Sequence, residues 1–592
     1  MEKDIVRYIG EVLSDLYVVD SNAVTISLER TKPGIEGDFT IVVFPFVKYS
    51  KKSPVDTAKE IGVSLKSRCV DIDSYNVVQG FLNITMTHEY WVKRLNNLAA
   101  SKKSSDNAGK PLIMVEFSSP NTNKPLHLGH LRNNFLGDSV ARIIKAAGNN
   151  VMKVNLVNDR GIHICKSMIA WLKWGNGATP ESTGMKGDKL VGDFYVLFNN
   201  KYKEELSKLK ESGLSDEEAE KKSQLMAETR EMLQKWEAGD EEVRKVWNMM
   251  NKWVYAGFDE TYKKIGISFD RIYYESQTYL LGKSIVTKGL ERGVFVRDSD
   301  TSVWIDLTNE GLDRKILLRS DGTTVYMTQD IGTAAQRFDE YHPEKMIYVV
   351  GNEQDYHFAV LKKVVQRLGE DYYDKIFHLS YGMVELPEGK MKSREGTVVD
   401  ADDLVADMIE TARAIAAENG KLGDLDEAEK NRIIEMIAIG ALKYFILKVD
   451  PKKQMVFNPK ESIDFNGNTG PFIQYTHARI CSVLRKAKAL NIDITKRVSE
   501  DVHLLDKEVS IISTLCTFEK VIDEAARKFD PGQVANYAYN LCKEFNQFYH
   551  DYSILNESDP NVIQLRLALS QQVANTVKRA MNLLGIEVPE VM

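Results

Sequence analysis

At 592 residues the chain is too long for a single hydrophobic core, and its length suggests three or four domains. Its 43% hydrophobic and 28% charged residues are typical of a globular protein and exclude a disordered or fibrous one. No uninterrupted apolar run approaches the roughly 18 residues of a membrane span, and the first residues lack the apolar core of a signal peptide. We therefore expect a cytoplasmic protein without a membrane partner. Because the net charge is −7, a nucleic-acid partner would have to be met by local basic patches.

The cysteines are scattered and include no C-x-x-C pair, which argues against a disulfide framework and against a cysteine-rich zinc site. We expect no zinc and no protein-bound metal. The five positions are Cys69, Cys165, Cys481, Cys516 and Cys542.

Residues 1–105 predict a small α+β domain. An opening helix is followed by alternating segments such as "AVTISLER", "FTIVVFPFV" and "GFLNITMT". The Ser/Lys/Gly-rich stretch from Ala99 to Lys110 then predicts a linker, the clearest domain boundary in the sequence.

Residues 106–403 predict an α/β domain. The strand-like "LIMVEF" is followed by a Pro/Asn-rich turn, a helical pattern from about Leu128 to Ala147, and the strand-like run Val151 to Val157. This order is the βαβ unit of a Rossmann-like, doubly wound parallel sheet. Since such sheets bind ligands at the carboxyl ends of their strands, we expect the site at the Pro/Asn-rich turn.

A charged, helical insertion is predicted at about residues 190–275, and we interpret it as a solvated face. The runs "SVWIDL", "KILLRS" and "KMIYVV" then predict the second half of the sheet. Connecting helices are expected over 404–455 and a C-terminal α-helical bundle over 456–592. The stretch "VDPKKQMVFNPKESIDFNGNTGPF" is the only long irregular break expected there.

His127 and His130 lie three residues apart at the predicted start of the helix, so they share a face with the backbone N–H groups and the positive end of the helix dipole. This arrangement suits a phosphate, and Gly129 between them leaves room for a flat base. Two alternatives stay open, an H-x-x-H metal site without a third ligand of suitable spacing and a pair of ordinary capping histidines. No G-x-x-x-x-G-K-[ST] loop or G-x-G-x-x-G motif offers another nucleotide site.

Longer strings now show a family resemblance. "HLGH" and the later "KMKSR" resemble the H-I-G-H and K-M-S-K-S signatures of class I aminoacyl-tRNA synthetases. "VEFSSPNTNKPLHLGHLRNNFLGDSVARI", "YMTQDIGTAAQR", "GNEQDYHF", "NTGPFIQYTHARI" and "LLGIEVPEVM" are similar to the arginyl-tRNA synthetases in particular. The resemblance spans nearly the whole chain.

The resemblance implies a ligase that joins L-arginine to ATP as arginyl-adenylate and transfers the arginine to the 3′ end of tRNA(Arg). It implies Mg²⁺ accompanying ATP, adenylate formation that depends on bound tRNA, and an anticodon-binding C-terminal bundle. We expect a monomer. The rivals are another class I synthetase and a tRNA-binding paralogue without catalysis.

The family's ATP-binding and catalytic positions fall on two stretches. The implied ATP-binding residues are His127, Gly129, His130, Met391 and Ser393, and the implied catalytic residues are His127, His130, Lys124, Lys390 and Lys392. The second signature departs from the family pattern, because its second lysine is displaced by one place. Lys124, just before the histidine motif, could take over the phosphate contact, although a solvated surface lysine is the alternative.

The family's arginine-binding positions correspond to Glu116, Asn121, Tyr326, Asp330 and Gln354. A guanidinium is a planar fork that a carboxylate can meet with two parallel hydrogen bonds. Tyr326 and Asp330 are four residues apart and should share one helix face. A site that demands both charge and shape should need no editing.

For tRNA, the resemblance implies contacts from both ends of the chain. The expected residues are Asn83, Tyr475, His477, Arg479 and Arg485. The C-terminal four mix aromatic and basic groups, a combination that stacks unpaired bases and neutralises phosphates. Asn83 could equally be a strand-edge residue, and some of the others could be core or capping residues.

Overall fold

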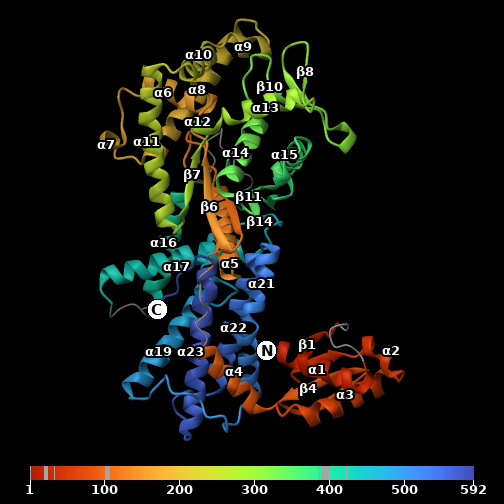
Figure 1. The fold of residues 1–592 in the computed structure, drawn as a ribbon. Coiled ribbons are helices and arrows are strands. Elements are labelled where there is room, and N and C mark those ends of the chain that lie inside the picture. The colour runs from red at the N-terminus through yellow and green to blue at the C-terminus, as the bar shows by residue number, and fades with distance from the viewer. Residues whose placement is uncertain are drawn as a thin grey trace.

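The computed structural model describes residues 2–18, 25–32, 34–100, 107, 109–385, 387, 399–419 and 425–592. The molecule is elongated, with an α/β domain and its helical insertion at one end, a helical bundle in the middle, and an N-terminal domain beside the bundle (Figure 1). The predicted combination of an N-terminal α+β domain, a doubly wound sheet and a C-terminal helical bundle is confirmed.

The N-terminal domain is a four-stranded antiparallel sheet with helices packed on it. Its strands are β1 (Leu28–Arg30), β2 (Phe39–Val42), β3 (Ile72–Val78) and β4 (Phe81–Met86), and its helices are α1 (Glu2–Tyr17), α2 (Val47–Ser50), α3 (Pro54–Arg68) and α4 (His88–Ala100). The strand order is β1-β2-β4-β3. The segment predicted as a linker lies largely outside the described residues, and Ala99 and Ala100 belong to the last turn of α4.

Five parallel strands form the central sheet. They are β5 (Leu112–Glu116), β6 (Asn150–Val157), β7 (Arg271–Tyr274), β11 (Lys345–Gly351) and β12 (Ile376–Tyr381), arranged β12-β11-β5-β6-β7. The chain therefore winds one way from β5 to β7 and the other way to β11 and β12. The direction reverses between β5 and β11, which is where doubly wound sheets bind ligands.

Helices link these strands. They are α5 (Leu128–Ala146), α6 (Ile162–Trp174), α7 (Pro180–Thr183), α8 (Gly187–Glu211), α9 (Asp216–Lys222), α10 (Gln224–Ala238), α11 (Glu241–Lys264), α12 (Glu275–Thr278), α13 (Leu281–Glu291), α14 (Tyr326–Tyr341) and α15 (Asp355–Arg367). α8 to α11 occupy most of the region predicted as a helical insertion, residues 190–275. Local sequence sets their ends: Ser215 and Glu218 form a capping box at the start of α9, and Gly239, with φ +86°, ends α10.

The prediction that "SVWIDL" and "KILLRS" continue the main sheet is wrong. They form β9 (Val303–Ile305) and β10 (Lys315–Leu318), which pair antiparallel in a separate sheet with β8 (Val296–Arg297). No crossover helix separates β9 from β10, and without one two successive strands cannot become parallel neighbours. Only "KMIYVV" joins the parallel sheet, as β11.

The last third of the chain is helical. Its helices are α16 (Ala401–Asn419), α17 (Glu427–Leu447), α18 (Pro459–Ser462), α19 (Gly470–Ala489), α20 (Asp506–Cys516), α21 (Phe518–Lys528), α22 (Pro531–Asp551) and α23 (Pro560–Leu583). The expected break before α19 carries β14 (Met455–Val456), which pairs with β13 (Val384–Glu385). A second irregular stretch, residues 490–505, was not expected. Although several helices exceed 20 residues, none in the described part of the chain is apolar enough to cross a membrane.

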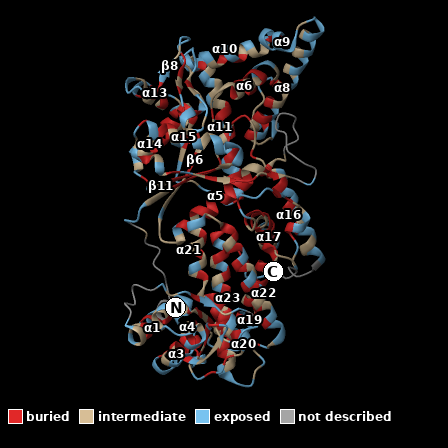
Figure 2. Ribbon diagram, turned by 90° about the vertical axis from the view of Figure 1, so that its right-hand side faces the viewer, coloured by how far each residue is buried: buried red, intermediate tan, exposed pale blue. Residues whose placement is uncertain are grey.

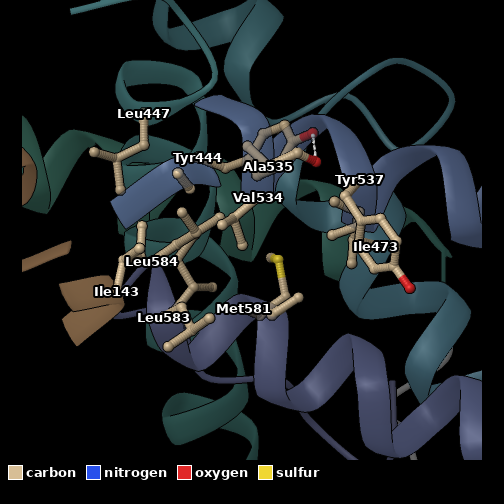
Figure 3. Packing of buried hydrophobic residues seen from close by; sticks show 14 of the residues in the cluster. Ile143, Tyr444, Leu447, Ile473, Val534, Ala535, Tyr537, Met581, Leu583 and Leu584 are labelled. Carbon is tan, nitrogen blue, oxygen red and sulfur yellow. Dashed lines mark hydrogen bonds between the residues drawn. The ribbon is translucent and has the colours of Figure 1, made fainter. Parts of the chain in front are cut away.

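α5 joins the sheet to the bundle. Most of its residues are buried, and it contacts the sheet as well as α17, α21, α22 and α23. Figure 2 shows buried residues running without interruption from the sheet into the bundle. In Figure 3, Ile143 of α5 lies beside Leu447, Leu583 and Leu584, and the hydroxyl of Tyr444 donates to the carbonyl oxygen of Ala535 at 3.1 Å. The two domains thus share one core, and α5 runs through it.

Candidate active site

The turn between β5 and α5 is held in a strained conformation. Ser118 and Ser119 have φ angles of +78° and +44°, which side-chain-bearing residues rarely adopt. Three asparagines hold the turn: the Ser118 N–H donates to Oδ1 of Asn133 at 2.5 Å, the Ser119 N–H donates to Oδ1 of Asn155 at 3.0 Å, and Nδ2 of Asn134 donates to Oγ of Ser118 at 3.2 Å. The turn is therefore fixed before any ligand binds.

The two histidines cap the start of α5. Nδ1 of His127 accepts from the Gly129 N–H, and Nδ1 of His130 accepts from the His127 N–H, both at 3.1 Å. Because each Nδ1 is an acceptor, each neutral ring carries its proton on Nε2. No described residue is bonded to either Nε2, so both can donate to a ligand. The capping alternative and the phosphate-site prediction are therefore compatible.

The two histidines at this site are uncharged, and Lys124 is its cationic side chain. Burial, with Lys124 close by, lowers the pKa of His127 to about 3 and also lowers the pKa of His130, so both rings are neutral at pH 7. Burial lowers the pKa of Lys124 as well, and no described carboxylate pairs with it. Two neutral donors and one ammonium at a helix N-terminus form a site for an anion.

This burial predicts an acid-sensitive fold. In the unfolded chain a histidine binds a proton near pH 6.5, whereas His127 in the folded chain does so only at about pH 3. The unfolded state therefore binds more protons between these values, and stability falls as the pH is lowered, by up to about 1.4 kcal/mol per pH unit. His127→Asn keeps a good helix cap, so its thermal midpoint should fall less between pH 6.5 and 5 than that of the parent. Parallel pH profiles for the two proteins would contradict this.

Gly129 lies directly against the first histidine. A Cβ at this position would stand 3.0 Å from Cε1 of His127. A side chain here would crowd the His127 ring, which would have to shift by a few tenths of an ångström.

Glu116, at the end of β5, is already paired within the protein. One of its oxygens forms a buried ion pair with Nη1 of Arg337, and Oγ of Ser119 donates to its Oε1 at 3.3 Å. The rings of Tyr273 and Tyr348 flank the Arg337 guanidinium at 4.8 and 5.6 Å. Because Arg337 occupies Oε2, the predicted contact of Glu116 with arginine would have to use Oε1. Arg337 also neutralises much of the negative charge of this carboxylate.

Tyr326 and Asp330 lie in the first turns of α14, on one helix face as predicted. Tyr326 is 70% exposed. Oδ2 of Asp330 lies 2.6 Å from Nε2 of His357, which follows β11 in α15. The other Asp330 oxygen has no described partner, so it can receive a guanidinium.

Asn121 and Gln354 flank the point where the winding direction reverses. Asn121 follows β5 and forms an isolated bridge with Asn158, just beyond β6. Gln354 ends the short 3-10 helix that follows β11. Both side chains are exposed, and both stand at the carboxyl ends of parallel strands, where the ligand was expected.

The second signature, with Lys390, Met391, Lys392 and Ser393, lies outside the described residues. The chain that follows it is nevertheless tied to the histidine turn. The Leu128 N–H donates to the carbonyl oxygen of Val399 at 3.3 Å, and the Ala401 N–H donates to that of Leu126 at 2.9 Å.

Three of the residues predicted to contact tRNA make internal contacts. Asn83 is 1% exposed in the interior strand β4, where Thr40 donates to its Oδ1 at 2.6 Å and it donates to Asn76 at 2.8 Å. The alternative that Asn83 is a strand-edge residue is also wrong, because β4 lies between β2 and β3. His477 is 2% exposed and donates through Nδ1 to the carbonyl oxygen of Pro589 at 2.9 Å, and Arg485 donates to that of Glu590 at 2.9 Å. A buried ring does not stack on bases, so His477 holds the C-terminal tail instead. The side chain of Arg485 is exposed, so its contact with tRNA stays a prediction.

Tyr475 and Arg479, in contrast, line an open groove of about 650 Å³. The Arg479 guanidinium lies 4.8 Å from the Tyr475 ring centre and donates to Asn546 at 2.8 Å. The C-terminal residue Met592 borders the same groove. Aromatic and basic groups thus meet here, as the prediction for unpaired bases requires.

Two polar partners in the site were not predicted. Arg337 lies seven residues after Asp330 on α14, so helical periodicity alone would have placed it on the same face. His357 lies within the quoted "GNEQDYHF", but nothing local to that string indicates that it meets Asp330.

Comparison with known proteins agrees with this geometry. A family model for the catalytic domain of class I (R) tRNA synthetases matches residues 94–458, so the sheet and its histidine turn define a class I aminoacyl-tRNA synthetase. Models for the arginyl-tRNA synthetase N-terminal domain and the DALR anticodon-binding domain match residues 3–86 and 473–592. Arginine–tRNA ligases of Parabacteroides distasonis and Bacteroides fragilis are 58% and 56% identical over the full length of both chains. The chain belongs to the arginyl-tRNA synthetase family.

Solved structures share the whole fold. Arginyl-tRNA synthetase of Thermus thermophilus, 25% identical, superposes with a TM-score of 0.77 over the full length of both chains. The Plasmodium falciparum enzyme, 19% identical, gives 0.75 over 100% of this chain and 99% of that one, a likeness of fold alone.

Proposed function

We propose that this chain activates L-arginine with ATP to form arginyl-adenylate and then transfers the arginine to the 3′ end of tRNA(Arg). The observation that carries the proposal is the pair of neutral imidazoles with free Nε2 groups beside Lys124, at the point where the sheet changes winding direction. The carboxylate of Asp330 stands at the same edge of the sheet, within the first turns of α14.

In the first step a carboxylate oxygen of arginine forms a bond to the α-phosphorus of ATP, and the bond to the pyrophosphate oxygen breaks. Negative charge builds up on the phosphate oxygens during this exchange. The Nε2–H groups of His127 and His130 would donate to these oxygens, and the ammonium of Lys124 would balance their charge. Preorganised donors of this kind act most strongly in the transition state.

Arginine would be selected by its side chain. The free oxygen of Asp330 would meet the guanidinium, with Tyr326, Asn121 and Gln354 around it and Oε1 of Glu116 beneath. An uncharged amino acid would leave the carboxylate unpaired, which is costly. Selection by binding therefore suffices, and no editing site is needed.

The remaining assignments extend this proposal. Tyr475 and Arg479 would contact the anticodon loop, and Mg²⁺ would arrive with the ATP phosphates. We also propose a cytoplasmic monomer, with domains over 1–105, 106–403 and 456–592, connecting helices over 404–455 and the insertion at 190–275.

Charging of bulk tRNA with each amino acid in turn tests the proposal. Only arginine should be transferred, with release of AMP and pyrophosphate. Transfer of another amino acid would indicate a different class I synthetase, and tRNA binding without any transfer would indicate a non-catalytic paralogue.

Lys124 should matter more for activation than Lys392. Lys124→Ala removes a charge-assisted hydrogen bond of about 1.5–3 kcal/mol to the ATP phosphates, so activation should slow by about ten- to a hundredfold. Lys392→Ala serves as the comparison, because its ammonium is displaced by one residue from the family position. Activation rates of both variants, measured with tRNA present, decide between them. A larger loss in Lys392→Ala would overturn the assignment of Lys124.

A further inference from the structure

A basic recess lies where the α/β domain meets the bundle, away from the histidine turn. It has a volume of about 340 Å³ and is bordered by the end of α11, by α5, by α17 and by the chain after α23. Figure 1 shows α17 and the C terminus below the lower end of α11. Five cationic side chains line the recess against two acidic ones. They are Arg142, Lys263, Lys264, Arg432 and Lys443, with Glu435 and Glu587.

The most deeply buried cation of the recess, Lys443, forms no ion pair with a described carboxylate. Lys443 is 3% exposed and donates to the carbonyl oxygen of Gly585 at 2.6 Å, its only described hydrogen bond. An ammonium has three donors, so two remain. The nearby carboxylate of Asp138 is occupied by Nε of Arg142 at 2.6 Å and Nζ of Lys153 at 3.0 Å. Buried positive charge is therefore in excess here, whereas the whole chain carries −7.

The recess continues toward the groove that holds Tyr475 and Arg479. A second hollow, of about 530 Å³, shares Arg432 with it and follows the C-terminal tail as far as Val591, and Met592 then borders the groove. The hollows thus form a row along the tail from the bundle to the α/β domain. The positive charge is concentrated in the basic recess itself, because the second hollow sets Arg432 and Lys578 against Glu429, Glu587 and Glu590.

We propose that this basic recess binds backbone phosphates of the tRNA between its anticodon loop and its acceptor end. The inference rests on the proposed tRNA ligation. Lys263, Lys264 and Arg432 stand at the exposed rim and would neutralise phosphates, while Lys443 adds positive charge from below. Contacts of this kind position the nucleic acid without reading its sequence.

The triple variant Lys263→Ala/Lys264→Ala/Arg432→Ala tests the recess, because all three side chains are exposed and their removal leaves the core intact. We expect the Kd for a tRNA(Arg) transcript to rise about tenfold. The slope of log Kd against log salt should fall by about 0.7–0.9 for each phosphate that the variant no longer neutralises. The KM values for arginine and ATP should stay unchanged.

The matched control is Lys520→Ala/Arg527→Ala/Lys528→Ala on α21, which removes the same charges from exposed positions apart from α17 (Figures 1 and 2). The control should bind tRNA as the parent does. An unchanged Kd and salt slope in the recess variant, or an equally weakened control, would overturn the inference. If the parent itself transfers no arginine to tRNA, it is the proposed function that fails.

Discussion

Replacing Asp330 by Asn should raise the KM for arginine by roughly 30-fold to several thousandfold, while the KM for ATP stays near that of the parent. The substitution removes the charge that meets the guanidinium, and a buried charge pair that loses one partner costs about 2–5 kcal/mol. Asparagine can still accept a hydrogen bond through Oδ1, so the contact with His357, now 2.6 Å long, can persist. The rise in the KM for arginine would therefore be caused by the missing charge and not by disorder of α14.

Asp339→Asn is the matched control, since it makes the same change at an exposed position of α14. It should leave both KM values unchanged. An Asp330→Asn variant with the arginine KM of the parent would show that the guanidinium is recognised elsewhere, and a parallel rise in the KM for ATP would point to general damage of the site.

Replacing His130 by Ala should lower kcat by about 100- to 1,000-fold, with a smaller effect on either KM. The removal of one preorganised donor to a developing oxyanion has this magnitude in other enzymes. The effect should fall on kcat because the Nε2–H contact strengthens as charge builds on the phosphate. Steady-state arginylation at saturating arginine, ATP and tRNA measures it.

His130 also has a structural task, so one substitution alone is ambiguous. Its Nδ1 accepts from the His127 N–H, and alanine removes that cap together with the Nε2 donor. His130→Asn separates the two, because its Oδ1 can replace Nδ1 as the capping acceptor while no donor stands at the place of Nε2. If Asn restores kcat, the histidine acts only as a cap. We expect instead that both variants are slow and that only the alanine variant loses thermal stability.

Local patterns were sufficient for much of the fold. The alternation of apolar runs with helical periodicity predicted β5, α5 and β6 in order, because periods of 2 and 3.6 are properties of single segments. The same periodicity placed Tyr326 and Asp330 on one helix face. It could not assign β9 and β10 to the right sheet, since strand-like runs carry no information about their neighbours.

The sequence alone therefore determined the kind of elements, the histidine turn and the family, because these depend on residues close together in the chain. Tertiary structure decided which partners each functional group has. The pairing of Glu116 with Arg337 and of Asp330 with His357 joins residues 221 and 27 positions apart, and the burial of Asn83 and His477 depends on segments that meet only in the folded chain. Charge and exposure at a site are set by such long-range packing, which no local motif encodes.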